Sequence, residues 1–278
     1  MNGKQRLWSN IALVGAGKVG TSLVAWLHAH GAQVAQVATR RSGDGGEQLA
    51  RRYGARATPL EDFSSAGSDL LLLAVADPAL DQVVAGLAQR PQADVALHTA
   101  GSRGASALAA LRHGTPEIAL GSLHPLKAFP TPRPDVADAA GVFFALDGDP
   151  PAVALGLELA HLWGGRAAVI SEDKRLAYHA AATLAAGGVV TLLAAAADLG
   201  RRLGLPAEVA EGYLALARGA LDQAETAAPD FERAITGPVA RGDEATFRQH
   251  LEALAGSAPE LKPLLEELAA ATRRLRDA

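Results

Sequence analysis

Residues 10–20 read Asn10-Ile11-Ala12-Leu13-Val14-Gly15-Ala16-Gly17-Lys18-Val19-Gly20, so that an apolar run passes directly into G-x-G-x-x-G. In this pattern Gly15 permits a tight turn, Gly17 lets an anion approach the backbone, and Gly20 lets a helix pack closely on the strand. The unpaired N–H groups at the start of that helix then face the anion. The motif predicts a binding site for the diphosphate of a dinucleotide, formed by Gly15, Ala16, Gly17, Lys18, Val19 and Gly20.

The residues after the motif favour this interpretation, because they complete a strand–helix–strand unit of about thirty residues. A helix is expected over residues 18–30, with four apolar side chains on one face: Val19, Leu23, Trp26 and Leu27. Gly31 is typical of a helix end, and residues 33–39 read as a second strand. The alternative interpretation is a surface glycine turn that binds no ligand.

The end of the second expected strand indicates which dinucleotide fits. An acidic side chain there would accept a hydrogen bond from the ribose 2′-hydroxyl of NAD. This chain instead has Thr39, Arg40, Arg41 and Ser42. Guanidinium and hydroxyl groups bind a 2′-phosphate, whereas a carboxylate would repel it. The sequence therefore predicts NADP as the cofactor; in the alternative interpretation, the two arginines are solvated loop charges.

Composition excludes several other classes of protein. The chain has 278 residues, of which 49% are hydrophobic and 20% charged, and this is typical of a soluble globular protein. Its net charge of −4 gives no basic surface for nucleic acid. Because it has no cysteine, disulfides and thiolate chemistry are excluded, and a cytoplasmic location is expected. The eight histidines show no paired ligand spacing, so no metal site is expected.

Two segments imitate membrane signals. Residues 1–29 place basic side chains before an apolar run, but Lys18 and three glycines interrupt that run. Residues 176–197 contain no charged side chain and are long enough to span a bilayer, yet they are rich in alanine and include polar residues. We expect no membrane contact. We expect instead a long helix buried on most sides, which a small helical domain would cover by forming a homodimer.

Strand and helix patterns alternate through residues 1–170. Further strands are expected over residues 69–75, 95–99, 118–123, 141–146 and 166–170, and helices over 46–53, 77–87, 105–112 and 151–163. This alternation predicts an α/β fold with a doubly wound parallel sheet, here a Rossmann dinucleotide-binding domain. Strand patterns end at Ser171, and residues 171–278 read as an all-helical domain for substrate binding and dimerisation.

Two strand ends are expected to contact the cofactor, because ligands of an open parallel sheet bind beyond the carboxyl ends of its strands. Val75, Ala76 and Asp77 follow one strand and are expected to flank the adenosine or the diphosphate. Ala100 and Gly101 follow the next strand and are expected beside the nicotinamide ribose.

Reduction of a carbonyl or imine by NADPH also needs a proton donor near the nicotinamide. His124 is the first candidate, because it follows a strand on the expected cleft side and the ordinary pKa of histidine allows both protonation states near neutrality. His179 is the second, and its neighbour Tyr178 would assist. Lys127, or likewise Lys174, would hold a substrate carboxylate. The alternative for each histidine is a purely structural hydrogen bond.

Three other stretches carry a resemblance to known proteins: Gly121-Ser122-Leu123-His124-Pro125-Leu126, Arg175-Leu176-Ala177-Tyr178-His179-Ala180-Ala181-Ala182, and Thr236-Gly237-Pro238-Val239-Ala240-Arg241-Gly242-Asp243 with His250 after it. With the nucleotide loop, they resemble a bacterial family of Rossmann-like proteins, described as NADP oxidoreductases, whose helical C-terminal domain has no assigned function. The family lies within the 6-phosphogluconate dehydrogenase-like group. The resemblance covers nearly the whole chain, and it implies a nicotinamide cofactor and a helical domain that commonly dimerises.

The chain departs from that family at Gly187, where members often carry an asparagine. If the asparagine contacts substrate or cofactor in relatives, this chain lacks the contact. Two functions are therefore carried forward. The first is an NADP-dependent oxidoreductase that transfers a hydride between the nicotinamide and a small acidic metabolite. The alternative is a non-catalytic NADP(H)-binding sensor or regulatory protein.

Overall fold

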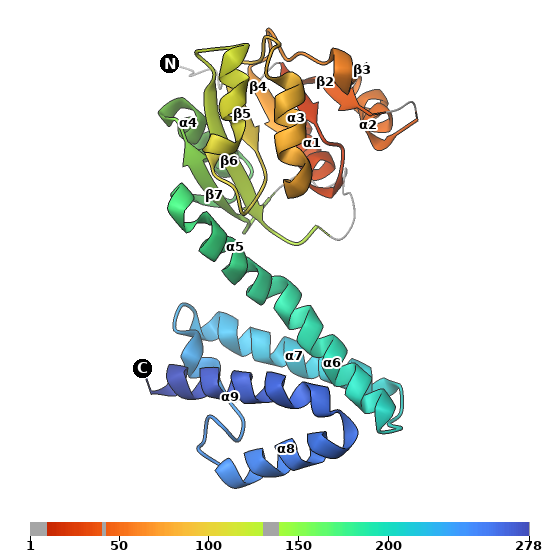
Figure 1. Cartoon of the computed structure of the whole chain (residues 1–278), viewed down its shortest axis with the longest axis vertical. Coiled ribbons are helices and arrows are strands. Elements are labelled where there is room, and N and C mark those ends of the chain that lie inside the picture. The colour runs from red at the N-terminus through yellow and green to blue at the C-terminus, as the bar shows by residue number, and fades with distance from the viewer. Residues whose placement is uncertain (1–9, 41–42, 130–138, 278) are drawn as a thin grey trace. The chain divides into compact units, whose positions relative to one another are not determined.

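The computed structural model describes residues 10–40, 43–129 and 139–277, and the chain divides into two compact units, residues 1–182 and 183–278. The first is an α/β unit and the second is helical (Figure 1), which confirms the expected fold class. The sequence placed the boundary at residue 170. The first unit extends further because helix α5 (Arg175–Thr183) bonds to the sheet through Arg175 and Tyr178.

The first unit is built on an eight-stranded sheet in the order β3-β2-β1-β4-β5-β6-β7-β8. The strands are β1 (Ile11–Val14), β2 (Val34–Thr39), β3 (Arg56–Pro59), β4 (Leu70–Leu73), β5 (Val95–His98), β6 (Ala119–Leu126), β7 (Phe143–Gly148) and β8 (Arg166–Val169).

Neighbouring strands are parallel except β6 and β7, which are antiparallel and pair His124 with Ala145. The expected doubly wound parallel sheet is therefore confirmed, with one antiparallel pair whose direction an apolar run does not encode. Strand β3 was not expected. It is short and mostly exposed at the sheet edge, and its Arg-Ala-Thr-Pro sequence lacks an apolar run.

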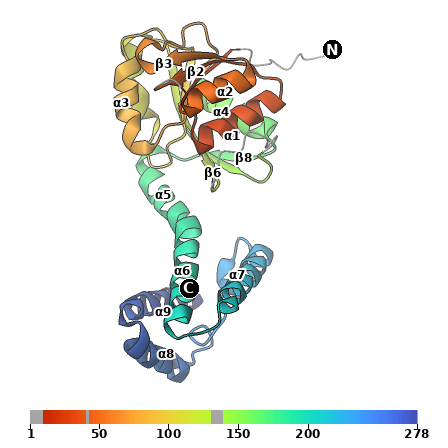
Figure 2. The same ribbon diagram turned by 90° about the vertical axis from the view of Figure 1, so that its right-hand side faces the viewer.

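Helices cover both faces of the sheet (Figure 2). One face carries α1 (Lys18–Ala29), α2 (Gly45–Tyr53) and α4 (Pro150–Leu162), and the other carries α3 (Asp77–Leu87) and the 3-10 segment Ala105–His113. That segment was expected to be α-helical, but it turns more tightly and bonds Ala107 N–H to Gly104 O. The first face is centred on Trp26, Phe144 and Trp163, whose ring centroids lie 5.5–6.2 Å apart. The two apolar cores hold the strand ends in place.

The second unit contains α6 (Val189–Arg202), α7 (Glu208–Ala227), α8 (Glu244–Ser257) and α9 (Lys262–Arg276). A π-helical turn, Leu184–Gly188, precedes α6. Few of its described residues are buried, and α7 has none; the buried set is Gly200, Phe247, Leu254, Ala258 and Ala269. This unit therefore has a small core for its size.

The long apolar helix, Glu172–Arg202, is exposed in the single chain. Leu176 and Leu184 are each 74% exposed and Val190 is 66% exposed. The expectation that this helix is buried on most sides is wrong for one chain, in which only Arg175 and Gly200 of the helix are buried. By length and composition alone this helix would also cross a membrane, and none of its most apolar window is buried.

Candidate functional site

The glycine loop has the geometry that its sequence predicts. Gly15 has φ +104°, and a Cβ there would lie 2.4 Å from Ala74 O, so only glycine fits. A Cβ on Gly20 would lie 1.9 Å from Gly15 O, which shows how closely α1 packs on the loop. At Gly17 a Cβ would meet nothing within 4 Å. Gly17 is the N-cap of α1, with no side-chain cap and no acidic residue in the first turn. The helix N-terminus is therefore open to an anion.

A pocket of about 300 Å³ lies at this loop, formed by the residues after β1, β2 and β4. It includes seven residues expected to bind the cofactor: Gly15, Ala16, Gly17, Thr39, Arg40, Val75 and Ala76. Six others lie outside its lining: Lys18, Val19, Gly20, Asp77, Ala100 and Gly101. The expected contacts of Arg41 and Ser42 fall outside the described residues.

An acidic residue that the sequence analysis missed also lines the pocket. Asp44 is the N-cap of α2; its Oδ1 accepts from Glu47 N–H at 3.0 Å and its Oδ2 accepts from Arg40 N–H at 2.8 Å. The spacing of Asp44 and Glu47 is that of a helix capping box, and this signal could have identified it. Two backbone N–H groups thus share the carboxylate charge, while the Arg40 side chain is exposed.

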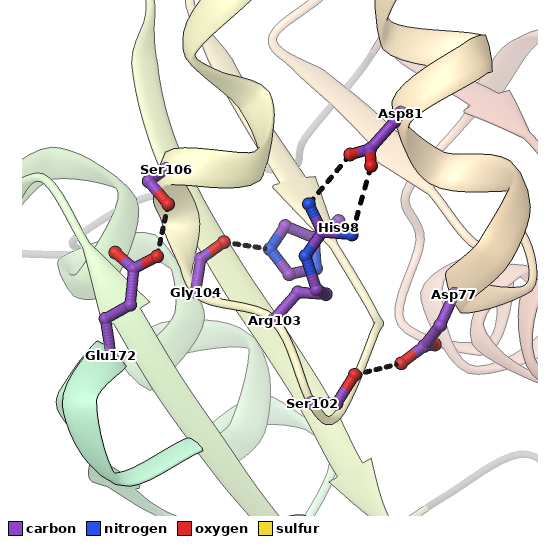
Figure 3. Close-up of polar contacts among 8 residues, drawn as sticks. All are labelled: Asp77, Asp81, His98, Ser102, Arg103, Gly104, Ser106 and Glu172. Atoms are coloured by element: carbon purple, nitrogen blue, oxygen red, sulfur yellow. Dashed lines mark hydrogen bonds and ion pairs between the residues drawn. The ribbon is translucent and has the colours of Figure 1, made fainter. Parts of the chain in front are cut away.

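A second part of the site is the loop Thr99–Gly104 after β5 (Figure 3). His98 is fully buried, and both of its ring nitrogens bond to the backbone of this loop. Nδ1 accepts from Ala100 N–H at 3.2 Å, so Nε2 carries the proton and donates to Gly104 O at 2.9 Å. Burial lowers the pKa of His98 to about 4, and it is therefore neutral near pH 7. Sequence reasoning missed His98, which continues an apolar strand without a local signal.

Side chains fasten the same loop from outside. Ser102 Oγ donates to Asp77 Oδ2 at 2.7 Å, and Arg103 forms two bonds to Asp81, at 2.7 and 3.3 Å (Figure 3). Ala105 N–H, directly after the loop, donates to Asp147 Oδ2 on β7 at 3.0 Å. Asp77, which is expected to contact the cofactor, also holds the loop that carries Ala100 and Gly101.

The catalytic candidates gather against this loop. A Cβ on Gly101 would lie 2.6 Å from His124 Nε2 and 2.4 Å from His179 Nδ1, so both rings touch the loop backbone. The centroids of the two imidazole rings are 5.7 Å apart. His124 Nδ1 and Tyr178 Oη form a hydrogen bond of 2.9 Å. The structure thus brings together β6, which carries His124, and α5, which carries Tyr178 and His179.

Burial changes the acid–base properties of these groups. The pKa of His124 falls to about 4, first because of burial, then because of His179 and the Arg175 guanidinium. Burial raises the pKa of Tyr178 above its ordinary value. The expectation that His124 has both protonation states near neutrality is therefore wrong, because desolvation disfavours its charged form.

Lys127 and Lys174 are exposed, and neither side chain makes a hydrogen bond or ion pair within the described ranges. Lys127 directly follows β6, and Lys174 directly precedes α5.

Across the part of the chain that the structure describes, no three His, Cys, Asp or Glu side chains group as a metal site. The chemistry available at the cluster is proton donation by the Tyr178 hydroxyl and the neutral His124 imidazole.

Two domain families match the chain. A Rossmann-like domain matches residues 3–125, and the domain of unknown function DUF2520 matches residues 142–272. No protein of curated function matches the chain in sequence.

Solved structures with the same fold cover nearly the whole chain. One, from Bacteroides fragilis, is described as a candidate NADP oxidoreductase; it is 24% identical, with a TM-score of 0.75 over 96% of this chain and 99% of that chain. A protein from Thermotoga maritima is 22% identical, with a TM-score of 0.76 over 96% and 98%. An imine reductase from Myxococcus stipitatus in complex with NADP+ is 18% identical, with a TM-score of 0.63 over 95% and 93%. The two matches together cover most of the chain, as a Rossmann-like domain followed by a DUF2520 domain.

Proposed function

We propose that the chain is an NADP-dependent oxidoreductase that transfers a hydride between the nicotinamide and a carbonyl or imine carbon of a small acidic metabolite. The observation that carries this proposal is the uncapped N-terminus of α1, which opens through Gly17 into a pocket of about 300 Å³. The NADP+ complex of the imine reductase, which has the same fold, supports the choice of cofactor.

The residues present fit a phosphorylated dinucleotide. The loop from Gly15 to Gly17 would hold the diphosphate, because its backbone N–H groups and the α1 dipole favour an anion. Thr39 and the Arg40 guanidinium would hold the 2′-phosphate, together with Arg41 and Ser42 as the sequence predicts. Bound NADPH supplies the hydride.

The cluster beside Gly101 would supply the proton. With Tyr178 O–H donating to His124 Nδ1, the second imidazole nitrogen, Nε2, carries a proton and faces the loop. As negative charge develops on the substrate oxygen, Nε2 gives up its proton while Nδ1 takes the Tyr178 proton; the phenolate is then reprotonated from solvent. His179 would orient the substrate, and Lys127 or Lys174 would hold its carboxylate.

Titration with NADPH tests the first step. We expect saturable binding by wild type and weaker binding of NADH. Arg40→Ala should reduce NADPH affinity by about tenfold or more, as loss of a charge-assisted bond of about 1.5–3 kcal/mol requires. Arg51→Ala is the matched control, because Arg51 makes only an exposed ion pair with Glu47 on α2. A chain that does not bind NADPH at millimolar concentration overturns the proposal.

Gly187 favours a second candidate function, a non-catalytic NADP(H)-binding sensor. It lies in the π-helical turn Leu184–Gly188 and has no side chain where the resembling family often has an amide. This hypothesis expects tight NADP(H) binding and no turnover of keto acids, imines or deazaflavins. Turnover of one panel member rejects it. Tyr178→Phe and His124→Gln should then each lower turnover, and the double variant should lose little more, because the two groups act as one unit.

The proposal includes a homodimer formed by the second unit. A groove of about 450 Å³ runs between α6, α8 and α9, lined mainly by leucine and alanine and including Leu192, Leu203, Leu264 and Leu268. These four side chains are 36–54% exposed. A second copy is the occupant we infer, because the same chain carries the exposed apolar helix Glu172–Arg202 that needs cover.

Light scattering after size-exclusion chromatography measures the molar mass directly. A dimer mass that Leu192→Glu converts to a monomer supports the homodimer, and a wild-type monomer contradicts it. The proposal also places the protein in the cytoplasm, without membrane or nucleic-acid partners. Wild type that sediments with lipid vesicles contradicts the part concerning membranes.

A further inference from the structure

Arg175 is a buried cation between the sheet and α5. Its side chain is 1% exposed and forms no ion pair within 4.0 Å in the described ranges. Its Nε donates to Ile170 O at 3.1 Å, and its Nη2 donates to Ser122 Oγ. Its Nη1 is buried without a hydrogen-bond partner among the described residues. Burying a cation with these neutral partners is costly, so its position calls for a physical reason.

The contacts of Arg175 repeat, one helical turn earlier, those of the candidate proton donors. Tyr178 and His179 follow it at the helical spacings that share one face of α5. On β6, Ser122 and His124 are alternate residues and share one face of the strand. Arg175 therefore contacts Ser122, and Tyr178 contacts His124. These two contacts join the same helix, α5, to the same strand, β6.

The first contact is fully buried and the second is more open. Arg175 and Ser122 are each 1% exposed, whereas Tyr178 and His124 are half-buried. The planar guanidinium directs its Nε and Nη2 bonds in fixed directions, and lysine cannot reproduce both bonds. Successive residues of α5 advance only about 1.5 Å along the helix axis. A small shift of α5 along β6 at Arg175 would therefore separate Tyr178 from His124.

We propose that Arg175 is a positioning residue, whose bonds to Ser122 and Ile170 set the register in which Tyr178 and His179 meet His124. This inference rests on the proposed function only for the catalytic use of that cluster; the geometric coupling itself is a property of the free chain.

The charge of Arg175 also affects the pKa of His124, together with the other titratable groups that face the ring. On α5 these are Tyr178 and His179; β5 contributes His98, and Asp77 lies at the start of α3. Arg175 and the histidines lower the pKa of His124, whereas Asp77 raises it. Charge and register are thus two separable effects of Arg175.

Nitrogen-15 NMR of histidine-labelled full-length protein separates them. His124→Gln assigns the His124 signals, and Tyr178→Phe gives their position without the hydroxyl contact. Arg175→Lys keeps the charge and breaks the register, whereas Ser122→Ala removes the hydroxyl that accepts from Nη2. We expect both to shift His124 Nδ1 in the direction of Tyr178→Phe. Arg175→Met should in addition raise the pKa of His124 above about 4.

Arg112→Lys is the matched control, because Arg112 is half-exposed and pairs with Asp149. It should leave His124 unchanged. Wild-type His124 signals in folded Arg175→Lys and Ser122→Ala proteins overturn the inference; if Arg175→Lys fails to fold, Ser122→Ala decides alone. NADPH titration of the same samples judges the proposed function separately. Failure of wild type to bind NADPH removes the function and leaves the NMR result standing.

Discussion

Alanine substitutions at two glycines of the nucleotide loop should affect coenzyme binding and folding stability differently. Gly17→Ala should weaken NADPH binding, whereas Gly20→Ala should lower stability. At Gly17 a Cβ meets no atom within 4 Å, and the backbone is extended, with φ −80° and ψ −165°. In Gly17→Ala, reduced entropy of the unfolded chain stabilises by about 0.4–1 kcal/mol, while the poorer N-cap costs about 1 kcal/mol. These effects nearly cancel, so we expect a melting temperature within about 2 °C of wild type.

Binding should respond very differently. The Cβ of alanine at position 17 would stand on the open face of the loop, where the proposed diphosphate approaches the α1 N-terminus. Loss of one charge-assisted hydrogen bond costs about 1.5–3 kcal/mol. This weakens NADPH binding by about 10- to 150-fold. Fluorescence titration with NADPH measures the change.

Gly20→Ala should show the opposite pattern in stability. Its Cβ would lie 1.9 Å from Gly15 O and 3.1 Å from Ala74 Cβ, so α1 must move away from the loop. Overpacking of this kind costs about 1–3 kcal/mol, which lowers the melting temperature by about 3–10 °C.

Gly86→Ala is the control for both variants, because its Cβ also meets nothing within 4 Å and it lies in α3, away from the loop. It should gain up to about 1 kcal/mol from helix propensity and bind NADPH as wild type does. Wild-type NADPH affinity in Gly17→Ala would refute the assignment of the diphosphate to this loop. An unchanged melting temperature in Gly20→Ala would refute the packing argument.

Three other outcomes follow from the structure. Burial lowers the pKa of His98 to about 4, so the unfolded chain binds a proton that the folded chain excludes. The contribution of His98 to the free energy of unfolding should therefore fall by up to about 3 kcal/mol as the pH drops from 6.5 towards 4. Urea unfolding across that range checks this, and a His98→Asn variant with the same pH slope would contradict it. Asp44→Ala should lose about 1 kcal/mol of stability with its N-cap and bind NADPH more tightly relative to NADH, since a negative charge leaves the pocket; unchanged relative affinity would place the 2′-phosphate elsewhere. Asp81→Ala breaks a half-exposed pair with Arg103, so thermal melts should show a loss below about 1 kcal/mol; a larger loss would mean that this pair controls the loop.

The geometry of the glycine loop could be predicted from sequence because it depends on local backbone chemistry. Gly15 adopts a positive φ, and Gly20 lets the helix approach the loop. At either position a residue with a Cβ would be strained. Asp44 carried an equally local signal in its spacing to Glu47, which is that of a helix capping box. The antiparallel pairing of β6 with β7 carried none, because strand direction depends on a connection rather than on residue pattern.

The catalytic side could be predicted only as a set of candidates. His124 and Tyr178 are 54 residues apart, and their contact exists because β6 and α5 pack together. No spacing in the sequence announces that packing. His98 is less visible still, since a histidine in an apolar strand reads as an ordinary core residue until its two bonds to the loop are seen.

Burial also changes how His124 can work. With a pKa of about 4, only about 0.1% of this side chain is charged at pH 7. A neutral imidazole N–H is a weak acid, so it releases its proton readily only if its other nitrogen takes up a proton in the same step. Tyr178 is the group at that nitrogen. In the proposed function, the histidine and the tyrosine, which the sequence offers as separate candidates, would therefore act as one donor, and whatever fixes the distance between them would control the proposed reaction.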